Sequence, residues 1–400
     1  MNIIFLTLVE INSVEERGTY SDLLRKFRNE GHNITIVTPV ERRKGISTNF
    51  KKKEDVSILQ VKTFNIQKTN IIEKGIGTLA IEYQFLSAIK KKLSDTKFDL
   101  ILYSTPPITF GKVIEFIKKR DNAYSYLLLK DIFPQNAIDM KMLKEGGFIH
   151  KQFVKKEKKL YQISDTIGCM SPANVEFVLK HNLEVNPQKV EVNPNTIQPV
   201  VFNYSEGEKS GIRTKYDVPV DKKVLIYGGN LGKPQGLDFL LETISETKNK
   251  DIFFLIVGDG TEFLRVKTWF DSNKPTNAKL LQRLPKEDYD KLLAACDVGL
   301  VFLDKNFLIP NFPSRLLSYL EMRMAVLAAT DSNTDIGTIV EENKCGFKVL
   351  AGDQRQMQEK LNLLMQSNLK EMGLNSEKLL LNEYTVDKSY QLIRDKIKNV

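Results

Sequence analysis

Short apolar runs alternate with amphipathic stretches along almost the whole chain. In the first half, apolar runs predict buried strands at 3–9, 34–38, 100–104, 125–129 and 165–170. Helices are predicted between them at 19–30, at 147–163 and in a stretch ending near 119. The second half predicts strands at 224–227, 253–257, 279–282, 298–302 and 326–329, separated by helices at 236–248, 261–272, 286–295 and 313–323. This alternation is typical of parallel sheets with crossover helices.

Two doubly wound domains account for this pattern, because 400 residues exceed what one hydrophobic core usually serves. We predict an N-terminal Rossmann-like domain at 1–200 and a C-terminal Rossmann-like domain at 201–380, with a polar linker and loop around 205–211. A last helix at 386–398, in a segment covering 381–400, is expected to pack back on the first domain. Residues 41–75 give weak signals and are interpreted as a basic loop with irregular strands. Ligands are expected in a cleft between the facing domains, at the carboxyl ends of the strands.

Composition adds that the chain is an ordinary globular protein, with 42% apolar and 27% charged residues. No run approaches the roughly 18 apolar residues of a membrane span, and residues 1–6 have the pattern of a buried strand, not of a signal peptide. The three cysteines, Cys169, Cys296 and Cys345, form neither an even set nor a CxxC pair. This disfavours a disulfide framework and a zinc site, and it indicates a cytoplasmic protein.

The net charge of +9 is unevenly distributed along the chain. Residues 1–200 hold 31 Lys+Arg against 22 Asp+Glu, whereas residues 201–400 hold 28 of each. A single lysine-rich run such as 155–159 is typical of a solvated helix face. The difference between the halves indicates an anionic partner for the first half: nucleic acid, a phosphorylated substrate or an acidic membrane surface.

The strongest local signal is the glycine-rich stretch 227–236, which leaves a predicted strand and enters a helix. Its glycines allow a ligand to approach the backbone closely, and the helix start offers free N–H groups suited to a diphosphate. Lys233 adds a positive charge. The stretch is not GxGxxG and lacks the acidic residue expected about 20 positions later, so a nicotinamide cofactor is disfavoured. A glycine turn needed only for packing is the alternative interpretation.

A second signal lies at 310–321, between a predicted strand and a helix that begins near Pro313. Arg315 stands in the first turn, where a cation opposes the helix dipole, and a bound anion would explain it. Ser318 and Glu321 are i, i+3 neighbours that are expected to face one site. An exposed helix carboxylate is the alternative interpretation of Glu321.

The first half contributes two candidate positions. Gly18 and Thr19 open the first predicted helix and form a second candidate phosphate cradle. Asp131 directly follows a predicted strand and is a candidate catalytic group, although a loop or N-cap aspartate is an equal interpretation. The three histidines lack metal-ligand spacing, and Asp288 and Asp290 fall inside a predicted polar helix as a solvated face. The pattern indicates phosphate chemistry without a metal or other cofactor.

In their order and spacing, these motifs resemble the retaining GT-B glycosyltransferases of family 4 over essentially all 400 residues. The similar features are the glycine loop at 18–20, Gly-His at 31–32, Pro-Asn at 194–195, the stretch 228–236 and Gly-Asp-Gly at 258–260. Segments 17–24 and 127–136 are most similar to bacterial capsule and O-antigen transferases of the N-acetylfucosaminyl type. The resemblance implies an α/β GT-B fold with two Rossmann-like domains facing a central cleft.

The chain departs from the family at two positions. The family usually has two glutamates eight positions apart, which contact the donor sugar and the ribose, and these positions are Pro310 and Ser318 here. Residues 313–315 resemble a subgroup with Pro-Ser-Lys/Arg before the helix. Either Ser318 itself or Glu321, one turn later, is then expected to bind the ribose. The family's histidine near the sixth carbon of the donor has no counterpart, which fits a 6-deoxy sugar.

The resemblance implies a metal-independent, retaining hexosyltransferase that uses a UDP-sugar, with an N-acetylated 6-deoxyhexosamine as the expected sugar. The acceptor is expected to be a polyprenyl-diphosphate-linked saccharide of capsule or O-antigen synthesis. The basic N-terminal domain is expected to bind the anionic inner face of the cell membrane, with no nucleic acid partner. The candidate catalytic residues are Asp131 and Glu321. The candidate donor-binding residues are Gly18, Thr19, Gly228, Gly229, Asn230, Gly232, Lys233, Gln235, Arg283, Leu284, Ser314, Arg315, Leu316, Ser318 and Glu321.

Three alternatives remain. A UDP-sugar 2-epimerase shares the two-domain layout, but it is expected to use several acidic and histidine residues, and the chain has three histidines. A catalytically inactive relative that acts as a binding subunit would explain Pro310 and Ser318. A basic nucleic-acid-binding protein would leave both glycine loops unexplained, and the aromatic residues do not interleave with the lysine clusters as stacking platforms would.

Overall fold

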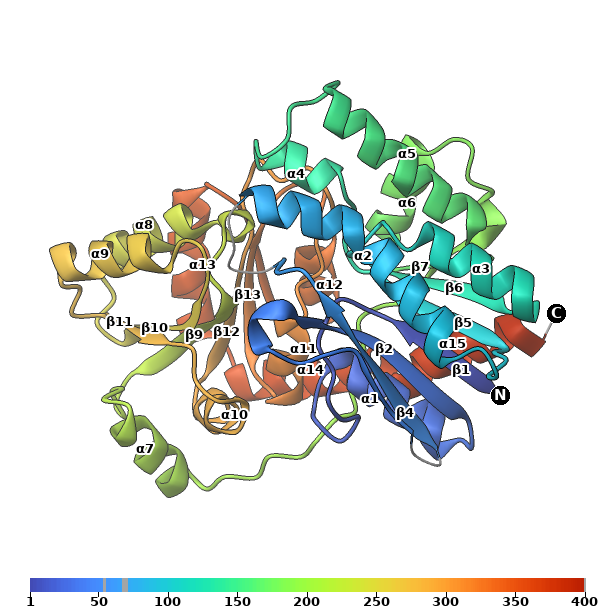
Figure 1. The fold of residues 1–400 in the computed structure, drawn as a ribbon. Helices are drawn as coiled ribbons and strands as arrows, with labels where there is room; N and C mark the ends of the chain where they lie inside the picture. Colours follow the sequence, from blue (N-terminus) through green and yellow to red (C-terminus); the bar gives the residue numbers. More distant parts are fainter. Residues whose placement is uncertain (53–54, 67–70, 399–400) are drawn as a thin grey trace. The chain divides into compact units, whose positions relative to one another are not determined.

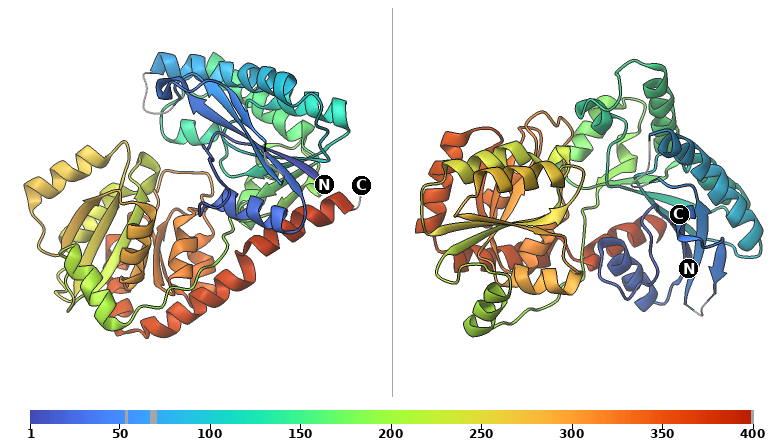
Figure 2. Two further views of the ribbon diagram at one scale, coloured as in Figure 1. Left: turned by 60° about the horizontal axis from the view of Figure 1, so that its bottom comes forward. Right: turned by 60° about the vertical axis from the view of Figure 1, so that its left-hand side comes forward.

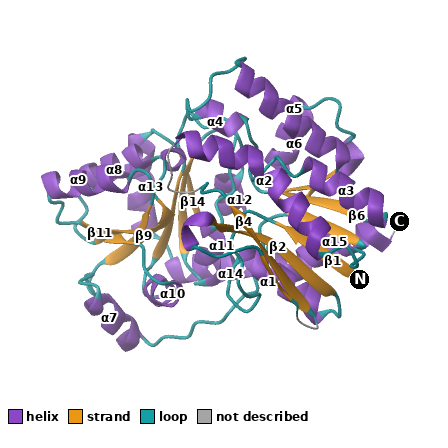
Figure 3. Cartoon of the chain, viewed as in Figure 1, coloured by secondary structure: helices purple, strands orange, loops and turns teal. Residues whose placement is uncertain are grey.

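The computed structural model describes residues 1–52, 55–66 and 71–398 and forms two compact units (Figure 1). Unit 1 consists of Met1–Gln198 and Thr385–Val400, and unit 2 is Pro199–Tyr384. The predicted domains end at 200 and 380, and residues 399 and 400 of the predicted last segment lie outside the described residues. Each unit is a sheet with helices on its faces (Figure 3).

The sheet of unit 1 has the strand order β3-β4-β2-β1-β5-β6-β7-β8. All neighbouring strands are parallel except β3 and β4, which are antiparallel. The strand order reverses between β1 and β5. After β1 the chain adds β2 and β4 on one side of the sheet, and after β5 it adds β6, β7 and β8 on the other side. The strands are β1 (Asn2–Leu6), β2 (Asn33–Glu41), β3 (Asn49–Lys51), β4 (Val56–Thr63), β5 (Leu100–Ser104), β6 (Tyr124–Leu129), β7 (Thr166–Cys169) and β8 (Val190–Val192).

The helices of unit 1 form two layers because connections between parallel strands are right-handed. α2, α3, α5 and α6 cover one face of the sheet, and α1 and α15 cover the other (Figures 1 and 2). The helices are α1 (Thr19–Asn29), α2 (Ile71–Lys92), α3 (Gly111–Asp121), α4 (Gln135–Asp139), α5 (Phe148–Ile163), α6 (Pro172–His181) and α15 (Val386–Lys398), with short 3-10 turns at Arg42–Lys44 and Pro187–Lys189.

Helix α15 belongs to unit 1 although it ends the chain. Its apolar residues Val386, Tyr390 and Ile393 are buried in the same cluster as Phe27 of α1. The Tyr390 ring packs edge-on against Phe27, with 4.9 Å between ring centroids. The chain therefore returns to the first unit after completing the second.

Unit 2 has a fully parallel sheet with the order β11-β10-β9-β12-β13-β14. Its strands are β9 (Lys223–Asn230), β10 (Ile252–Asp259), β11 (Ala278–Gln282), β12 (Val298–Phe302), β13 (Ala325–Thr330) and β14 (Gly346–Leu350). Its helices are α7 (Glu206–Lys215), α8 (Leu237–Glu246), α9 (Phe263–Asn273), α10 (Lys286–Ala294), α11 (Arg315–Glu321), α12 (Ile336–Glu342), α13 (Gln354–Gln366) and α14 (Leu369–Glu383), with a 3-10 turn at Lys233–Gln235.

Two stretches of the chain contradict the sequence-based expectation. The region 41–75, predicted as a basic loop with irregular strands, contains the regular, buried eight-residue strand β4 and the start of the 22-residue helix α2. Its residues 53–54 and 67–70 lie outside the described residues. The predicted linker at 205–211 begins helix α7 instead. This helix has no apolar period to reveal it, but a capping box joins Ser205 and Glu208 at its start.

Candidate functional site

The carboxyl edge of the unit 2 sheet opens between β9 and β12, where the strand order reverses. Ladder pairing between these strands stops at Ile226 and Gly299, so the end of β9 has no backbone partner on that side. In doubly wound sheets this switch point is where ligands bind. The glycine-rich stretch lies at this opening, since β9 ends at Asn230.

The hydroxyl of Tyr319 on α11 bridges the two separating strands. It accepts a hydrogen bond from the Gly228 N–H at 3.2 Å and donates one to the Leu300 carbonyl at 3.1 Å. Burial raises the pKa of Tyr319 to about 12, so the hydroxyl keeps the proton that it donates. A side chain thus replaces a ladder bond at the switch point.

Two positions of the sheet require glycine, because tyrosine rings pack directly against the backbone there. A Cβ at Gly228 would lie 1.8 Å from the hydroxyl oxygen of Tyr289, which comes from α10. A Cβ at Gly299 would lie 2.3 Å from Cγ of Tyr319. Such distances are far below van der Waals contact, so the strand glycines and the rings form one packed unit. Tyr289 was not predicted as a site residue, because Asp288 and Asp290 on either side of it are typical of a solvated helix face.

Arg315 occupies the centre of this tyrosine cluster. Its guanidinium carbon lies 4.2 Å from the ring centroid of Tyr227, and Nη2 donates a 2.6 Å hydrogen bond to Oε1 of Gln235. Nη1 is buried and has no hydrogen-bond partner in the described part of the chain. No carboxylate among the residues that the structure describes lies within ion-pair distance of it. A buried cation without a counter-charge is costly unless a ligand supplies the anion.

The loop from Gly228 to Gly236 has the conformation that only glycine adopts easily at two positions. Gly229 has φ 122° and lies beside Arg315, since a Cβ there would be 3.6 Å from Nη2. Gly236 has φ 54°, and a Cβ there would be 2.6 Å from the Leu303 carbonyl oxygen. Asn230 and Lys233 are exposed, whereas Gln235 is buried against Arg315 and Tyr227. A Cβ at Gly232 would lie 2.8 Å from the side-chain nitrogen Nδ2 of Asn230.

The other predicted donor residues of unit 2 differ in where they lie and in how exposed they are. Arg283 and Leu284 follow β11, at the same carboxyl edge as Gly228. Ser314 is exposed and precedes α11, which begins at Arg315 and not at Pro313 as expected. The side chain of Leu316 is fully buried in the core. Ser318 is half-buried, one turn after Arg315.

Glu321 is held by another part of unit 2. Its Oε1 accepts a 2.8 Å hydrogen bond from the Val200 N–H, and the residue is buried. It ends α11, six residues beyond Arg315, which corresponds to about 9 Å along a helix axis. The structure therefore groups Glu321 with the first residues of unit 2 and not with the glycine loop, in contrast to the expectation that Ser318 and Glu321 share a site.

In unit 1, Asp131 is held in a clamp just after β6. Nδ2 of Asn136 donates to both carboxylate oxygens, at 2.8 and 2.7 Å, while Oδ1 of Asn136 is buried without a hydrogen-bond partner among the described residues. Burial raises the pKa of Asp131 to about 6, a change that the Asn136 bonds oppose. Burial also lowers the pKa of neighbouring Lys130 to about 7, and its Nζ donates to the carbonyls of Asn193 and Pro194 at 3.2 Å.

Two further polar residues lie at the switch point of unit 1. The Ser104 hydroxyl at the end of β5 is 3.4 Å from that of Thr7, just after β1. Tyr20 of α1 interacts with Ser104, and burial together with the charge of Asp131 raises the pKa of this tyrosine. Tyr20 and Asn136 were not predicted as site residues, because only the fold brings them to Ser104 and Asp131.

The predicted phosphate cradle at Gly18 and Thr19 is already occupied by a carboxylate. Oδ1 of Asp22 accepts the Gly18 N–H at 3.3 Å, and Arg25 pairs with the same oxygen at 2.6 Å. A carboxylate thus lies beside the Gly18 N–H, which does not favour a second anion there, although no side chain caps the first turn of α1. Gly18 and Thr19 belong to unit 1, whereas the glycine loop belongs to unit 2.

The part of the chain that the structure describes contains neither a cluster of metal ligands nor a membrane-spanning helix. No three His, Cys, Asp or Glu side chains in that part of the chain gather as ligands for a metal ion. None of the helices there is long and apolar enough to cross a bilayer.

Part of unit 2 resembles a known protein family. Residues 208–378 match the family described as Glycosyl transferases group 1. The chain as a whole is 22% identical over 320 residues to a probable glycosyltransferase of Pseudomonas aeruginosa, WbjE, covering 80% of this chain and 78% of that protein. It is also 26% identical over 251 residues to WcaI of Escherichia coli K12, a putative colanic acid biosynthesis glycosyl transferase, covering 61% of this chain and 60% of WcaI.

Solved glycosyltransferase structures share the fold over the full chain. Sucrose-phosphate synthase of Thermosynechococcus elongatus matches with a TM-score of 0.76 at 13% identity, covering all of both chains. HepE of Anabaena, solved in complex with UDP, matches with a TM-score of 0.71 at 14% identity, again over all of both chains. The two Rossmann-like units therefore form a GT-B glycosyltransferase fold, which confirms the predicted fold class.

Proposed function

We propose that the protein is a retaining glycosyltransferase of the family 4 type that takes its sugar from a UDP-sugar and places it on a lipid-linked saccharide. The single observation that carries the donor assignment is Arg315, a cation with a buried Nη1 that lacks an acceptor, beside Gly229 at the switch point of unit 2. A diphosphate supplies both the missing acceptor and the missing charge. The UDP complex of HepE, a protein of the same fold, supports a nucleotide donor.

The proposed donor site assigns a role to each group at the carboxyl edge. Arg315, the Gly228–Gly236 loop and exposed Lys233 bind the diphosphate, while the backbone at Arg283 and Leu284 contacts the base. Ser318, which has the same helical face as Arg315, binds the ribose, because Glu321 is engaged by Val200. As the bond between the anomeric carbon and the β-phosphate oxygen breaks, Arg315 stabilises the charge that develops on that oxygen.

The proposed sugar transfer requires no metal ion, because the bonds and the proton are accounted for by the donor and the acceptor. The acceptor hydroxyl oxygen forms the new bond to the anomeric carbon on the face that UDP leaves, and its proton passes to the departing phosphate oxygen. Asp131, once ionised, is proposed to accept a hydrogen bond from another hydroxyl of the acceptor sugar and so to orient that sugar, which leaves the proton of the attacking hydroxyl to the phosphate oxygen. We expect kcat/KM to rise with pH through about 6, because burial places the pKa of Asp131 there.

The proposed acceptor is a polyprenyl-diphosphate-linked saccharide of capsule or O-antigen synthesis, presented at the cytoplasmic face of the cell membrane. The relative WcaI, a putative colanic acid biosynthesis glycosyl transferase, supports a polysaccharide pathway. The donor sugar is proposed to be an N-acetylated 6-deoxyhexosamine. The net charge of the first half of the chain supports attachment to an anionic membrane surface.

The donor assignment is tested by calorimetric titration with UDP, GDP, ADP and CMP, with and without Mg²⁺. We expect UDP-selective binding that is independent of Mg²⁺ and about 100-fold weaker in Arg315→Gln, since a charge-assisted phosphate contact contributes up to about 3 kcal/mol. The matched control is Arg355→Gln on α13, whose exposed guanidinium pairs only with Glu359. Equal UDP affinity in both variants would overturn the donor site, and binding of no nucleotide would favour the inactive binding subunit.

A further inference from the structure

One helical layer of unit 1 holds almost the entire net charge of the protein. Residues 77–92 of α2 have a net charge of +2, α3 has +2 and α5 has +4, against +9 for the whole chain. All three helices lie on the same face of the sheet, with their outer surfaces away from it (Figures 1 and 2). The excess charge is therefore concentrated on one side of the unit.

The lysines at one end of this layer have no acidic partners. Lys141, Lys144, Lys151 and Lys155 are exposed, and none forms an ion pair among the described residues. Further along α5 the lysines are neutralised: Lys156 pairs with Glu82 at 3.7 Å, Lys158 with Glu184 at 2.9 Å, and Lys159 with Glu115. Residues 141–155, which we call the α5 tip, therefore carry four lysines without an ion pair and one exposed glutamate, Glu145. Lys91 and Lys92 at the end of α2 are also exposed and have no ion pair among the described residues.

The α5 tip also exposes large apolar side chains. Met142 is 68% exposed, Phe148 77% and Ile149 59%, all within eight consecutive residues. The turn that carries them is ordered by its own bonds, from the Gly147 N–H to the Lys144 carbonyl at 3.2 Å and from the Gly146 N–H to Nδ1 of His150 at 3.0 Å. Three exposed apolar residues on one bonded turn, surrounded by lysines, need a partner to cover them.

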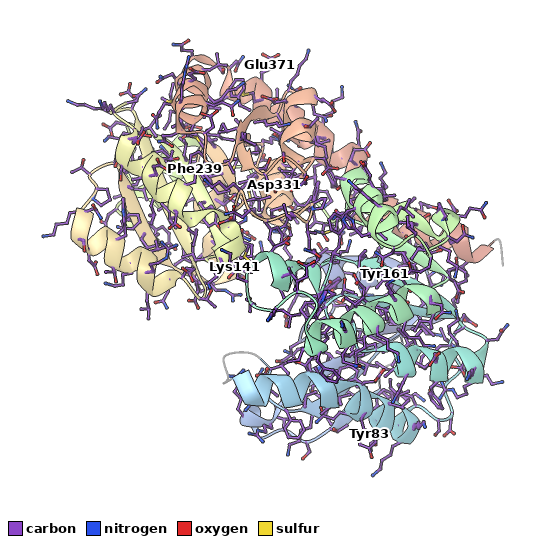
Figure 4. The ribbon with its side chains drawn as sticks, turned by 90° about the horizontal axis from the view of Figure 1, so that it is seen from above. Tyr83, Lys141, Tyr161, Phe239, Asp331 and Glu371 are labelled. Carbon is purple, nitrogen blue, oxygen red and sulfur yellow. The ribbon has the colours of Figure 1, made fainter. Side chains whose placement is uncertain are left out.

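We propose that the α5 tip docks the protein on an anionic lipid bilayer, with Met142, Phe148 and Ile149 entering the headgroup–acyl boundary and the four unpaired lysines contacting acidic headgroups. This combination of apolar and basic groups is what interfacial binding requires. Tyr83 on α2 is 75% exposed and points away from the layer (Figure 4), and its neighbour Glu82 is tied to α5 through Lys156. An exposed tyrosine on the same layer fits the interfacial belt of a membrane.

The aliphatic side chains of the cluster favour lipid over nucleic acid as the partner. The Phe148 ring could stack on a base, but Met142 and Ile149 could not, and phosphate contacts alone would leave these two exposed to water. In a bilayer these same side chains leave water, while the lysines remain at the polar surface. The inference rests on the proposed function, since it names the surface by which the enzyme reaches a lipid-linked acceptor.

The test measures partition of the full chain onto vesicles of 30% phosphatidylglycerol in phosphatidylcholine, by co-sedimentation. We expect binding that weakens strongly between 0.1 and 1 M salt, and at least a 100-fold loss in Lys141→Gln/Lys144→Gln/Lys151→Gln/Lys155→Gln. Met142→Ser/Phe148→Ser/Ile149→Ser is expected to lose at least tenfold, with the salt dependence retained.

Matched controls come from unit 2, where exposed groups of the same kinds lie on other elements. Lys248→Gln/Lys250→Gln/Lys370→Gln/Lys378→Gln and Leu264→Ser/Leu381→Ser are expected to change partition less than twofold. Equal losses in tip and control variants overturn the proposal, as does tighter binding to duplex DNA than to vesicles with the same lysine dependence. UDP titration of every variant separates the two claims: vesicle binding without UDP binding contradicts only the proposed function, and UDP binding without vesicle binding contradicts only the docking surface.

Discussion

The two switch points of this protein differ in local charge, and neither charge follows from the net charge of its half of the chain. The first half has an excess of nine basic residues, yet its switch point is surrounded by Asp131, Ser104 and Tyr20. The second half has equal numbers of acidic and basic residues, yet its switch point centres on Arg315 without a counter-charge. Net charge therefore indicates where the outer surface meets a partner, and single buried groups indicate the chemistry.

The same architecture thus supports two different tasks. A guanidinium among tyrosine rings suits an anionic diphosphate, whereas a clamped carboxylate suits a neutral hydroxyl.

Gly228→Ala is expected to cause the largest loss, about 4 kcal/mol of unit 2 stability together with loss of UDP binding. The new Cβ would lie 1.8 Å from the Tyr289 hydroxyl oxygen, so the ring or the strand must move. Thermal and urea unfolding measure the loss. Combining it with Tyr289→Ala removes the clash, and the double variant should be at least 1.5 kcal/mol more stable than the sum of the single changes predicts. Strict additivity would show that the two residues do not touch.

Asp131→Asn is expected to change the pH dependence of unit 1 stability. Because burial raises the pKa of Asp131 to about 6, its contribution to stability is present at low pH and is lost as pH rises from about 4 through 6. The loss should be roughly 2 kcal/mol, and Asn136 can rotate its amide to accept a bond from the new side chain. Unfolding free energies at pH 4, 5, 6 and 7 should fall more steeply in the wild type than in the variant, because burial raises the pKa of Glu157 to about 7 and this residue adds a fall that both proteins share. Parallel curves would contradict the assignment.

Tyr319→Phe is expected to destabilise unit 2 by about 2 kcal/mol, since the Gly228 N–H and the Leu300 carbonyl lose their shared partner. The melting temperature should decrease by about 4–8 °C for a unit of this size. Tyr204→Phe, a tyrosine-to-phenylalanine change elsewhere in unit 2, serves as the control and should have little effect. UDP affinity should decrease modestly, because Arg315 remains in place.

Ser318→Ala and Glu321→Gln are expected to have the smallest effects, and they distinguish the two candidates for ribose binding. Ser318→Ala should weaken UDP binding about fivefold, the equivalent of one neutral hydrogen bond. Glu321→Gln should leave UDP affinity within twofold and lower stability by about 1 kcal/mol, because its carboxylate holds the Val200 N–H. Titration of both variants with UDP and with uracil alone provides the measurement, and the reverse ranking would assign the ribose to Glu321.

The sequence by itself determined the fold class and most elements of the second half. Each predicted strand there lies within an observed strand, because continuous apolar runs are buried on both faces of a parallel sheet. It failed for α2 and β4, which carry no clear period, and for α7, whose polar helix depends on its capping box. The glycine-rich stretch 228–236 and Arg315 were predicted as ligand-binding positions from residue type and place alone, since glycines allow close approach to the backbone and a cation at a helix start is unfavourable without an anion.

Only the tertiary structure decided which groups come together. Tyr227, Tyr289 and Tyr319 lie on three different elements, and no spacing along the chain shows that all three interact with Arg315. Glu321, next to the expected site in sequence, is held by Val200 instead, and Gly18 by Asp22. Local periodicity reports what is buried, but contacts between distant residues follow from how strands are ordered in a sheet, and that order is set by packing of the whole unit.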